Sequence, residues 1–372
     1  MRINVSKATF SSIVGIGQKV KKAALESGKE YLELNRGVNS VVGIDLTEIQ
    51  KMMNFNAKEF QLYAPNLGID SLRKAIVSEY FPSYTNYMDD MAKNISITPG
   101  GMPALDLIIQ TLNVDNIYFP EFYWGSYSKM ATIRNKPFSF YDSLDYFNEE
   151  KLATLNESTC IFICDPNNPT GMKLDDYYLY QKIDEISKTG AIVIFDSPYR
   201  KLFYHDRFFE QLMLPNVIIA ESFSKWIGLP GARLGFIHST NKEFNEELNI
   251  RLLYEFNGVS SPSQLLVEKI LTTDEGQEAI CDFQDETTEH ITSNILWLRE
   301  NNLLVDEIYK GENPIGIFAI INKSEDFLFQ NKIGAVGLDK FVYHNKDNWS
   351  SYSRICVSVP HELFVKFMKN II

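Results

Sequence analysis

The sequence predicts an α/β fold: a mostly parallel central sheet wrapped by helices, together with a smaller α+β unit. Two observations predict this class. Between residues 94 and 238, short apolar runs of β type alternate with longer amphipathic helical patterns, which is typical of a parallel sheet with helical crossovers. After about residue 240 the pattern changes to a long helical stretch followed by separate strand-like runs.

The expected strands of the central sheet are short and apolar. They are NISIT (94–98), NIYF (116–119), FSFY (138–141), CIFIC (160–164), AIVIF (191–195), NVIIA (216–220) and LGFIH (234–238). Helical patterns such as MPALDLIIQTL and DDYYLYQKIDEISKTG separate many of them. Right-handed crossovers would bring the functional loops to one edge of this sheet.

The smaller unit is expected from the C-terminal third of the chain. A helical stretch spans roughly 242–303 and is interrupted near NGVSSPSQ, and the strand-like runs IGIFAII, KIGAVGLDKFVYH and SRICVSV follow it. We expect residues 1–45 to form an N-terminal arm that packs with this unit, residues 46–265 to form the large domain, and residues 266–372 the small domain. No linker rich in proline, glycine and serine marks a boundary between them.

Composition narrows the class of protein. A chain of 372 residues that is 45% hydrophobic can bury a large core. The net charge of −12 and the lack of a basic run argue against nucleic acid and anionic membranes as partners. The N-terminus lacks the apolar core of a signal peptide, and no apolar run reaches the roughly 20 residues of a membrane span. We therefore expect a cytoplasmic protein.

Cysteine and histidine show no pattern typical of a metal site or a disulfide framework. The five histidines are scattered, and we expect no metal. We expect all the cysteines to be buried, reduced thiols: Cys160, Cys164, Cys281 and Cys356.

The stretch SFSKWIGLPGARLG (222–235) places Lys225 just after an expected buried strand. A solvated surface position is the ordinary fate of a lysine. However, desolvation and nearby positive charge lower a lysine pKa, which makes a neutral amine available for Schiff-base chemistry. Ser222, Ser224 and Arg233 add donors that suit a phosphate, and the glycines permit a close turn. A phosphate clamp beside a Schiff-base lysine describes a site for pyridoxal phosphate.

Two further motifs lie upstream, at the ends of expected strands: CDPNNPTG (164–171) and FDSPY (195–199). In this order and spacing, the three motifs resemble those of the fold-type I enzymes that depend on pyridoxal phosphate, specifically the class I/II aminotransferases of the aspartate aminotransferase-like superfamily. The resemblance covers nearly the whole chain. It implies a large domain with a seven-stranded, mostly parallel sheet and a smaller α+β domain.

The resemblance also implies a role for each motif residue. Lys225 would carry the cofactor as a Schiff base and act as general base, and Asp196 would pair with the pyridine nitrogen. Asn168 and Tyr199 would hydrogen-bond the hydroxyl oxygen of the ring. The phosphate would be held by Ser222, Ser224 and Arg233.

The stretch ITPGGMPALDLI (97–108) is expected to be a strand, a glycine turn and a helix. The first N–H groups of a helix are available to an anion. By the resemblance, the turn at Gly100 would cradle the cofactor phosphate, with backbone amides from Gly101 and Met102. An ordinary turn between strand and helix is the alternative.

The stretch FPEFYWGSY (119–127) is rich in aromatic residues, whose ordinary role is core packing. In the family, an aromatic residue after this strand stacks on the pyridine ring. We assign this role to Trp124, which would also contact the substrate; Phe122 is the alternative.

The stretch LYAPNLGIDSLRKAI (62–76) is similar to a family segment that reaches the cofactor of the other subunit. Tyr63 would then contact the partner's phosphate, which implies a homodimer with shared sites. The alternative is a turn and a helix start without a cofactor contact.

Two stretches are expected at the substrate. Arg354 begins the apolar run of SRICVSV, and an arginine in such a place needs an anionic partner. The resemblance implies the substrate α-carboxylate, with Asn168 nearby, whereas a structural ion pair is the alternative. LNRGVN (34–39) resembles the arm that closes over the substrate, with Asn39 where relatives often have glycine.

The implied activity is ping-pong transamination between an L-amino acid and a 2-oxo acid. The same residues also serve C–S lyases, amino-acid decarboxylases and cyclopropane-forming synthases. A non-catalytic sensor that binds pyridoxal phosphate is less favoured, because the family pattern begins by about Leu34 and leaves no room for a DNA-binding domain. Dicarboxylate-specific members have a second arginine. The corresponding position in this chain falls near Phe256 and is not an arginine. DSPY resembles the subgroup that acts on aromatic, aminoadipate or branched-chain amino acids.

Overall fold

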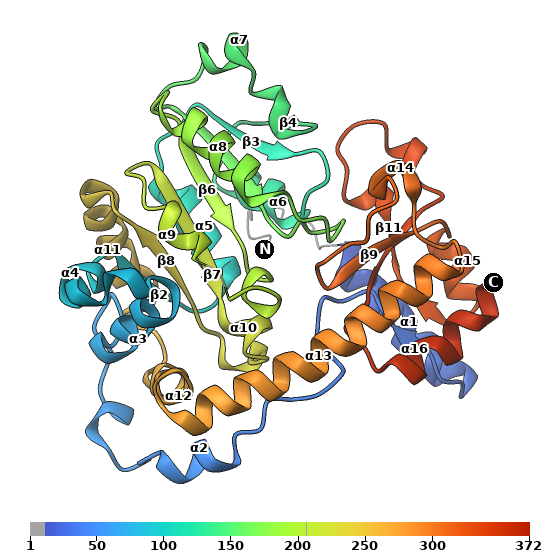
Figure 1. Cartoon of the computed structure of the whole chain (residues 1–372), viewed down its shortest axis with the longest axis horizontal. Helices are drawn as coiled ribbons and strands as arrows, with labels where there is room; N and C mark the ends of the chain where they lie inside the picture. The colour runs from blue at the N-terminus through green and yellow to red at the C-terminus, as the bar shows by residue number, and fades with distance from the viewer. Residues whose placement is uncertain (1–11, 206) are drawn as a thin grey trace, which may run out of the picture.

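The computed structural model describes residues 12–205 and 207–372, which fold into a large unit and a small unit joined by a long helix (Figure 1). The large unit is built on a seven-stranded sheet. Its strands are β2 (Ile95–Thr98), β3 (Asn116–Pro120), β4 (Phe138–Tyr141), β5 (Thr159–Cys164), β6 (Ile192–Asp196), β7 (Val217–Ser222) and β8 (Gly235–Ser239). Every strand predicted for this sheet is present, which confirms the α/β class.

The strand order is β2-β8-β7-β6-β5-β3-β4, and β8 runs antiparallel to both of its neighbours. The other pairs are parallel. The carboxyl ends of β5, β6 and β7 therefore meet at one edge, where ligands bind in open α/β sheets.

Helices cover both faces of this sheet (Figure 1). The helices of the large unit are α2 (Thr47–Met52), α3 (Asp70–Tyr80), α4 (Met88–Ala92), α5 (Gly101–Thr111), α6 (Ser126–Ile133), α7 (Glu149–Leu152), α8 (Asp176–Ser187), α9 (Phe208–Gln211), α10 (Phe223–Trp226), α11 (Lys242–Phe256) and α12 (Ser261–Thr272). Strand β5 is buried along its length, with Phe162 in the cluster formed with α5 and α6, and Ile161 in the cluster formed with α8. Burial of both faces explains its unbroken apolar sequence.

The interruption in the long helical stretch has a local cause. Helix α11 ends where Asn257 adopts a left-handed conformation (φ 49°) and Gly258 follows with φ 95°. Helix α12 then starts with Ser260 as its N-cap, and Pro262 lies in its first turn.

The small unit combines both ends of the described chain. Its elements are α1 (Ser12–Ser27), β1 (Leu32–Glu33), α13 (Asp274–Glu300), α14 (Asp306–Tyr309), β9 (Phe318–Ile321), α15 (Glu325–Gln330), β10 (Ile333–Gly334), β11 (Val336–Gly337), β12 (Ser353–Cys356) and α16 (His361–Met368). Strand β1 pairs with β10, and β12 lies between β11 and β9 in an antiparallel sheet. Residues 1–11 of the expected arm lie outside the described residues.

The position of α12 bears on the boundary between the units. This helix packs against α3 and α2 of the large unit, whereas α13 continues from it to α16 of the small unit (Figure 1). We therefore propose that the boundary lies within α13 rather than after residue 265, because residues 266–272 belong to α12.

The two units also meet at the loop after β5. The carbonyl of Gly171 accepts hydrogen bonds from the amides of Ile315 (2.8 Å) and Gly316 (3.0 Å). The Tyr309 hydroxyl donates to the carbonyl of Thr170 at 2.8 Å. Gly171 has φ 70°, and a Cβ atom there would collide with the carbonyl of Phe318. Glycine is therefore required for this close approach.

Three of the four cysteines are buried, but Cys281 on α13 is exposed. The expectation that all of them are buried is therefore wrong for Cys281, which lies on the solvent-facing side of an amphipathic helix. Within residues 12–205 and 207–372, no helix is both long and apolar enough to cross a membrane.

Candidate active site

A cavity of about 360 Å³ opens at the carboxyl ends of β5, β6 and β7 and is closed on one side by the small unit. Cys164, Asp196 and Ser222, which end these three strands, all line it. Most of the predicted site residues lie in its wall, namely Gly101, Met102, Trp124, Asn168, Asp196, Tyr199, Ser222, Ser224, Lys225, Arg233 and Arg354. Residues that are far apart in the sequence thus converge on one cavity.

Lys225 lies on the short helix α10, directly after β7. Its Nζ atom donates a hydrogen bond to the carbonyl of Gly37. Burial lowers its pKa, and the positive charges of Arg354, Arg233 and Arg36 lower it further, against an opposing effect of Cys356. The site therefore favours the neutral amine that a nucleophile or a general base requires.

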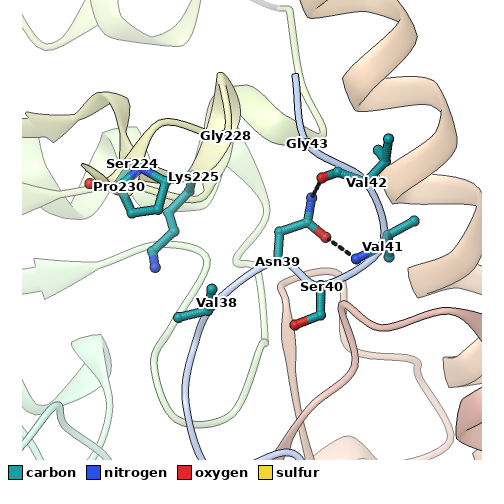
Figure 2. A pocket seen from close by; sticks show the side chains of 10 residues that line it. All are labelled: Val38, Asn39, Ser40, Val41, Val42, Gly43, Ser224, Lys225, Gly228 and Pro230. Carbon is teal, nitrogen blue, oxygen red and sulfur yellow. Dashed lines mark hydrogen bonds between the residues drawn. The ribbon is translucent and has the colours of Figure 1, made fainter. Parts of the chain in front are cut away.

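A second pocket lies beside the first, between the Lys225 turn and the segment of residues 38–43. Figure 2 shows Asn39 on this segment, with its side chain turned back onto its own turn. The Asn39 side chain bonds the carbonyl of Val42 (3.1 Å) and the amide of Val41 (2.9 Å). It also bonds Thr287 (3.0 Å) and Ser358 (2.8 Å). Its hydrogen-bonding capacity is used to fix the segment, so its placement does not support the predicted substrate contact.

Asp196 has a partner that the sequence reasoning missed. The Tyr127 hydroxyl donates a hydrogen bond to Oδ2 of Asp196. Burial raises the pKa of Asp196 to about 7, and the bond from Tyr127 opposes this rise. The sequence contained an indication of this contact. Tyr127 ends the aromatic stretch and lies three residues after Trp124, the spacing of one helical turn, so the two rings can face the same side.

Arg354 belongs to a chain of polar contacts. Its Nη1 atom donates to Oδ1 of Asn168 (3.3 Å), and Nδ2 of Asn168 donates to the Tyr199 hydroxyl (3.2 Å). Its Nη2 atom donates to the carbonyl of Asn35 at 2.5 Å. Its guanidinium lies 4.2 Å from the centroid of the Phe318 ring.

The charge of Arg354 has no counter-charge in the described part of the chain. The side chain is buried, and no described carboxylate forms an ion pair with it. Burial lowers its pKa to about 10, so it stays protonated at neutral pH. The structural ion pair considered as the alternative is absent among the described residues, and a buried, unpaired guanidinium favours binding of an anion.

The turn before α5 lies against the Lys225 segment. A Cβ atom at Gly101 would lie 3.1 Å from Cβ of Ser222, and one at Gly100 would lie 3.0 Å from Nη2 of Arg233. Gly100 itself does not line the cavity but adopts φ 105° behind it. Ser222 caps α10, and its Oγ atom lies 3.0 Å from Oγ of Ser224. The N-terminus of α5, two hydroxyls and a guanidinium thus meet, an arrangement that fits a phosphate.

The structure distinguishes between the two candidates for stacking on the cofactor ring, Trp124 and Phe122. Trp124 lines the cavity and packs edge-on against Tyr127, with ring centroids 5.7 Å apart. Phe122 packs instead on Trp349, at 5.0 Å between ring centroids. Only the first of the two is thus brought to the cavity.

Tyr63 lies away from this cavity, with 83% of its surface exposed. A role within its own subunit is therefore not supported, whereas the predicted role toward a partner subunit stays a prediction. Among the described residues, no group of three or more His, Cys, Asp or Glu side chains is placed to hold a metal ion.

Comparisons with known proteins agree with this architecture. Residues 30–362 match the family model described as aminotransferase class I and II. The chain is 27% identical over 238 residues, 61% of its length, to aspartate aminotransferase of Pyrococcus horikoshii. It is 27% identical over 240 residues, 62% of its length, to histidinol-phosphate aminotransferase of Haemophilus influenzae. The matches span 60% and 66% of the length of these two relatives.

The fold is also similar to that of aspartate aminotransferase from Thermus thermophilus, solved with maleate, with a TM-score of 0.82 and 17% identity. That similarity covers 100% of this chain and 99% of the other. The chain belongs to the class I and II aminotransferase family. Enzymes of this family use pyridoxal phosphate. The phosphate-binding arrangement next to Lys225 and Asp196 fits that cofactor.

Proposed function

We propose that the protein is an aminotransferase that transfers an amino group between an L-amino acid and a 2-oxo acid. One observation carries the proposal: Lys225, Asp196 and the unpaired Arg354 line a single cavity. This set provides an amine, a carboxylate and an anion-binding group, which are the three functions that amino-acid chemistry with pyridoxal phosphate needs.

The cavity wall supports a specific set of cofactor contacts. Ser222, Ser224, Arg233 and the amides of Gly101 and Met102 would hold the phosphate. Asp196 would pair with the ring nitrogen, and Asn168 and Tyr199 would contact the ring hydroxyl. Trp124 would stack on the ring. When bound, pyridoxal phosphate supplies an electron sink that stabilises the negative charge left at the substrate Cα after deprotonation.

The protein's own groups would divide the remaining work. Arg354 would hold the substrate α-carboxylate, and its fixed contacts to Asn168 and Asn35 would orient it. Nζ of Lys225, whose pKa is lowered by burial and by neighbouring cations, would remove the Cα proton and hold it for return. A cation placed against Asp196 would lower the raised pKa of this carboxyl and keep it ionised.

We also propose that the protein acts as a homodimer. Large apolar side chains are exposed on two neighbouring parts of the large unit, namely Leu62 and Tyr63 on one and Ile250 and Tyr254 on the other. These parts are adjacent, because the hydroxyl of Ser261, just beyond α11, donates to the carbonyl of Leu62 at 3.2 Å. Exposed apolar side chains on such neighbouring segments favour a protein partner, and a second copy would place Tyr63 near a second cavity.

The test of the proposed activity uses the protein loaded with pyridoxal phosphate. Borohydride reduction followed by peptide mapping should find the cofactor on Lys225, and Lys225→Ala should remove this attachment. An amino acid added without an acceptor should release about one equivalent of 2-oxo acid per subunit and then stop, as a ping-pong mechanism requires. Continuous release of ammonia and pyruvate, or of CO₂, would establish a lyase or a decarboxylase instead. Labelling at another lysine would contradict the proposal.

A further inference from the structure

The cavity contains one cation more than the proposed function uses. Arg36, Lys225, Arg233 and Arg354 all line it, and Asp196 is the carboxylate in its wall. The proposed function assigns the cofactor to Lys225 and Arg233, and the substrate α-carboxylate to Arg354. Arg36 is left without a role, and no carboxylate in the described part of the chain forms an ion pair with it.

The main chain on both sides of Arg36 is fixed. The carbonyl of Asn35 accepts from Arg354 at 2.5 Å, and the carbonyl of Gly37 accepts from Lys225. One residue earlier, the amide of Leu34 donates to the carbonyl of Gly334 at 2.8 Å. Gly37 lies so close to the Phe318 ring that a Cβ atom would clash with it. The main chain of Arg36 is thus held between the two groups that would handle the substrate, while its exposed side chain lines the cavity.

The electrostatic setting of Arg36 favours an anion. Its charge acts on Lys225 together with the charges of Arg354 and Arg233. Such a group of like charges repels itself until an anion neutralises part of it. The nearby wall is apolar, with Val14 of α1 and Val38 lining the same cavity, which suits the methylene groups of a side chain rather than a further polar group.

We propose that Arg36 binds a second anionic group, a carboxylate or a phosphate, at the far end of the side chain of one of the two substrates. The inference rests on the proposed function, since it requires that Arg354 takes the α-carboxylate. The second cation is supplied by the N-terminal segment of the same chain. It is not supplied from residues 252–262 around Phe256, which contain no arginine.

The test is calorimetric titration of the protein loaded with pyridoxal phosphate, using unreactive probes. Glutarate and valerate have the same chain length and differ in the second carboxylate. The wild type should bind glutarate about five- to tenfold more tightly than valerate, as expected for one partly exposed charge pair. Arg36→Gln should remove this preference and leave the affinity for valerate unchanged. Arg36→Lys should keep part of it.

Two controls make the result specific. Lys29→Gln removes one exposed positive charge from the same unit, away from the cavity, and should leave both affinities unchanged. Arg354→Gln should weaken both probes to a similar degree. If Arg354→Gln changed neither affinity, the assignment of the α-carboxylate in the proposed function would fail, whatever the result at Arg36.

The outcomes at Arg36 are then distinct. An Arg36→Gln variant that keeps the wild-type preference for glutarate overturns the inference, as does one that weakens both probes equally. A third probe, 4-phosphonobutyrate, identifies the distal group. Tighter binding of this probe than of glutarate, lost in Arg36→Gln, assigns a phosphate, whereas the reverse order assigns a carboxylate.

Discussion

The hydroxyl of Tyr127 on α6 donates a hydrogen bond to the carboxylate of Asp196 at the end of β6, and both side chains are buried. Asp196 therefore has a donor that favours its ionised form, although burial favours the neutral one. The charge of the proposed partner of the cofactor ring thus depends on a tyrosine from a different element of the large unit.

Replacing Tyr127 with phenylalanine should raise the pKa of Asp196 above about 7, because the bond that opposes the effect of burial is lost. The acid limb of the pH–rate profile should move to higher pH, and kcat should fall about tenfold near neutral pH. Tyr123→Phe is the matched control, since its ring is buried in the same cluster but does not line the cavity. Equal shifts in the two variants would refute a specific role for Tyr127.

Arg354→Lys should lower kcat/KM about 100-fold, mainly through a higher KM for the amino acid. Lysine keeps the charge but cannot contact Asn168, Asn35 and a carboxylate with one planar group. Steady-state kinetics would measure the effect. Arg134→Lys, at an ion pair with Asp106 outside the cavity, should keep wild-type kinetics. An unchanged KM in Arg354→Lys would exclude it as the carboxylate-binding group.

Gly100→Ala should weaken binding of pyridoxal phosphate and destabilise the fold by about 1–3 kcal/mol, because φ 105° and ψ 171° define a conformation that only glycine adopts readily. The added Cβ atom would also press on Arg233. Gly231→Ala, two residues from Arg233 and with no atom near its Cβ position, is the control. Thermal unfolding and titration with the cofactor separate the two effects. Unchanged affinity in Gly100→Ala would show that the turn does not position Arg233.

Glu221 should make stability depend on pH. It is buried beneath Ser222 and contacts Ser197 and Tyr80. Burial raises its pKa from 4.5 to about 8. Its neutral form is therefore favoured by folding, and this stability is complete below pH 4.5 and is lost as pH rises toward 8.

Glu221→Gln should reduce the loss of unfolding free energy between pH 4.5 and 8 by an amount on the order of a few kcal/mol. Asp196 contributes a similar loss up to about pH 7, so part of the dependence should remain. Denaturant unfolding at several pH values would measure both. If Glu221→Gln had the same pH dependence as the wild type, Glu221 would be ionised in the folded protein.

Mixing two inactive variants tests the predicted role of Tyr63 in a shared site. A hybrid dimer of Lys225→Ala and Tyr63→Ala subunits would contain one complete site, formed by Lys225 of one subunit and Tyr63 of the other. Mixing should therefore restore activity. Sedimentation analysis would verify that hybrids form, and hybrids without restored activity would refute the shared site.

The fold could be predicted from the sequence because burial on both faces leaves an unbroken apolar run for each central strand, as in β5. Periodicity does not encode direction, so the antiparallel β8 could not be foreseen from it. The cavity residues could be predicted from the sequence where a motif specified them, as for Asn168 and Lys225.

The remaining site residues depend on contacts between segments that are far apart. Tyr127 acquires its place from the packing of α6 against the end of β6, and Arg36 from hydrogen bonds of its neighbours to residues nearly 190 and 320 positions away. Within the stretch LNRGVN, the side chain of Asn39 fixes the turn while Arg36 lines the cavity, a distinction that the sequence pattern does not contain.

The loop after β5 shows how one short run of residues can serve two purposes. The Asn168 side chain faces the cavity, whereas the carbonyls of Thr170 and Gly171 hold the small unit. Arg354 belongs to that small unit and contacts Asn168. Gly171, which does not line the cavity, therefore helps to set the distance between the two halves of the proposed substrate site. A bulkier residue at Gly171 would press on the carbonyl of Phe318 and so shift the small unit, with Arg354, relative to the cofactor side of the cavity.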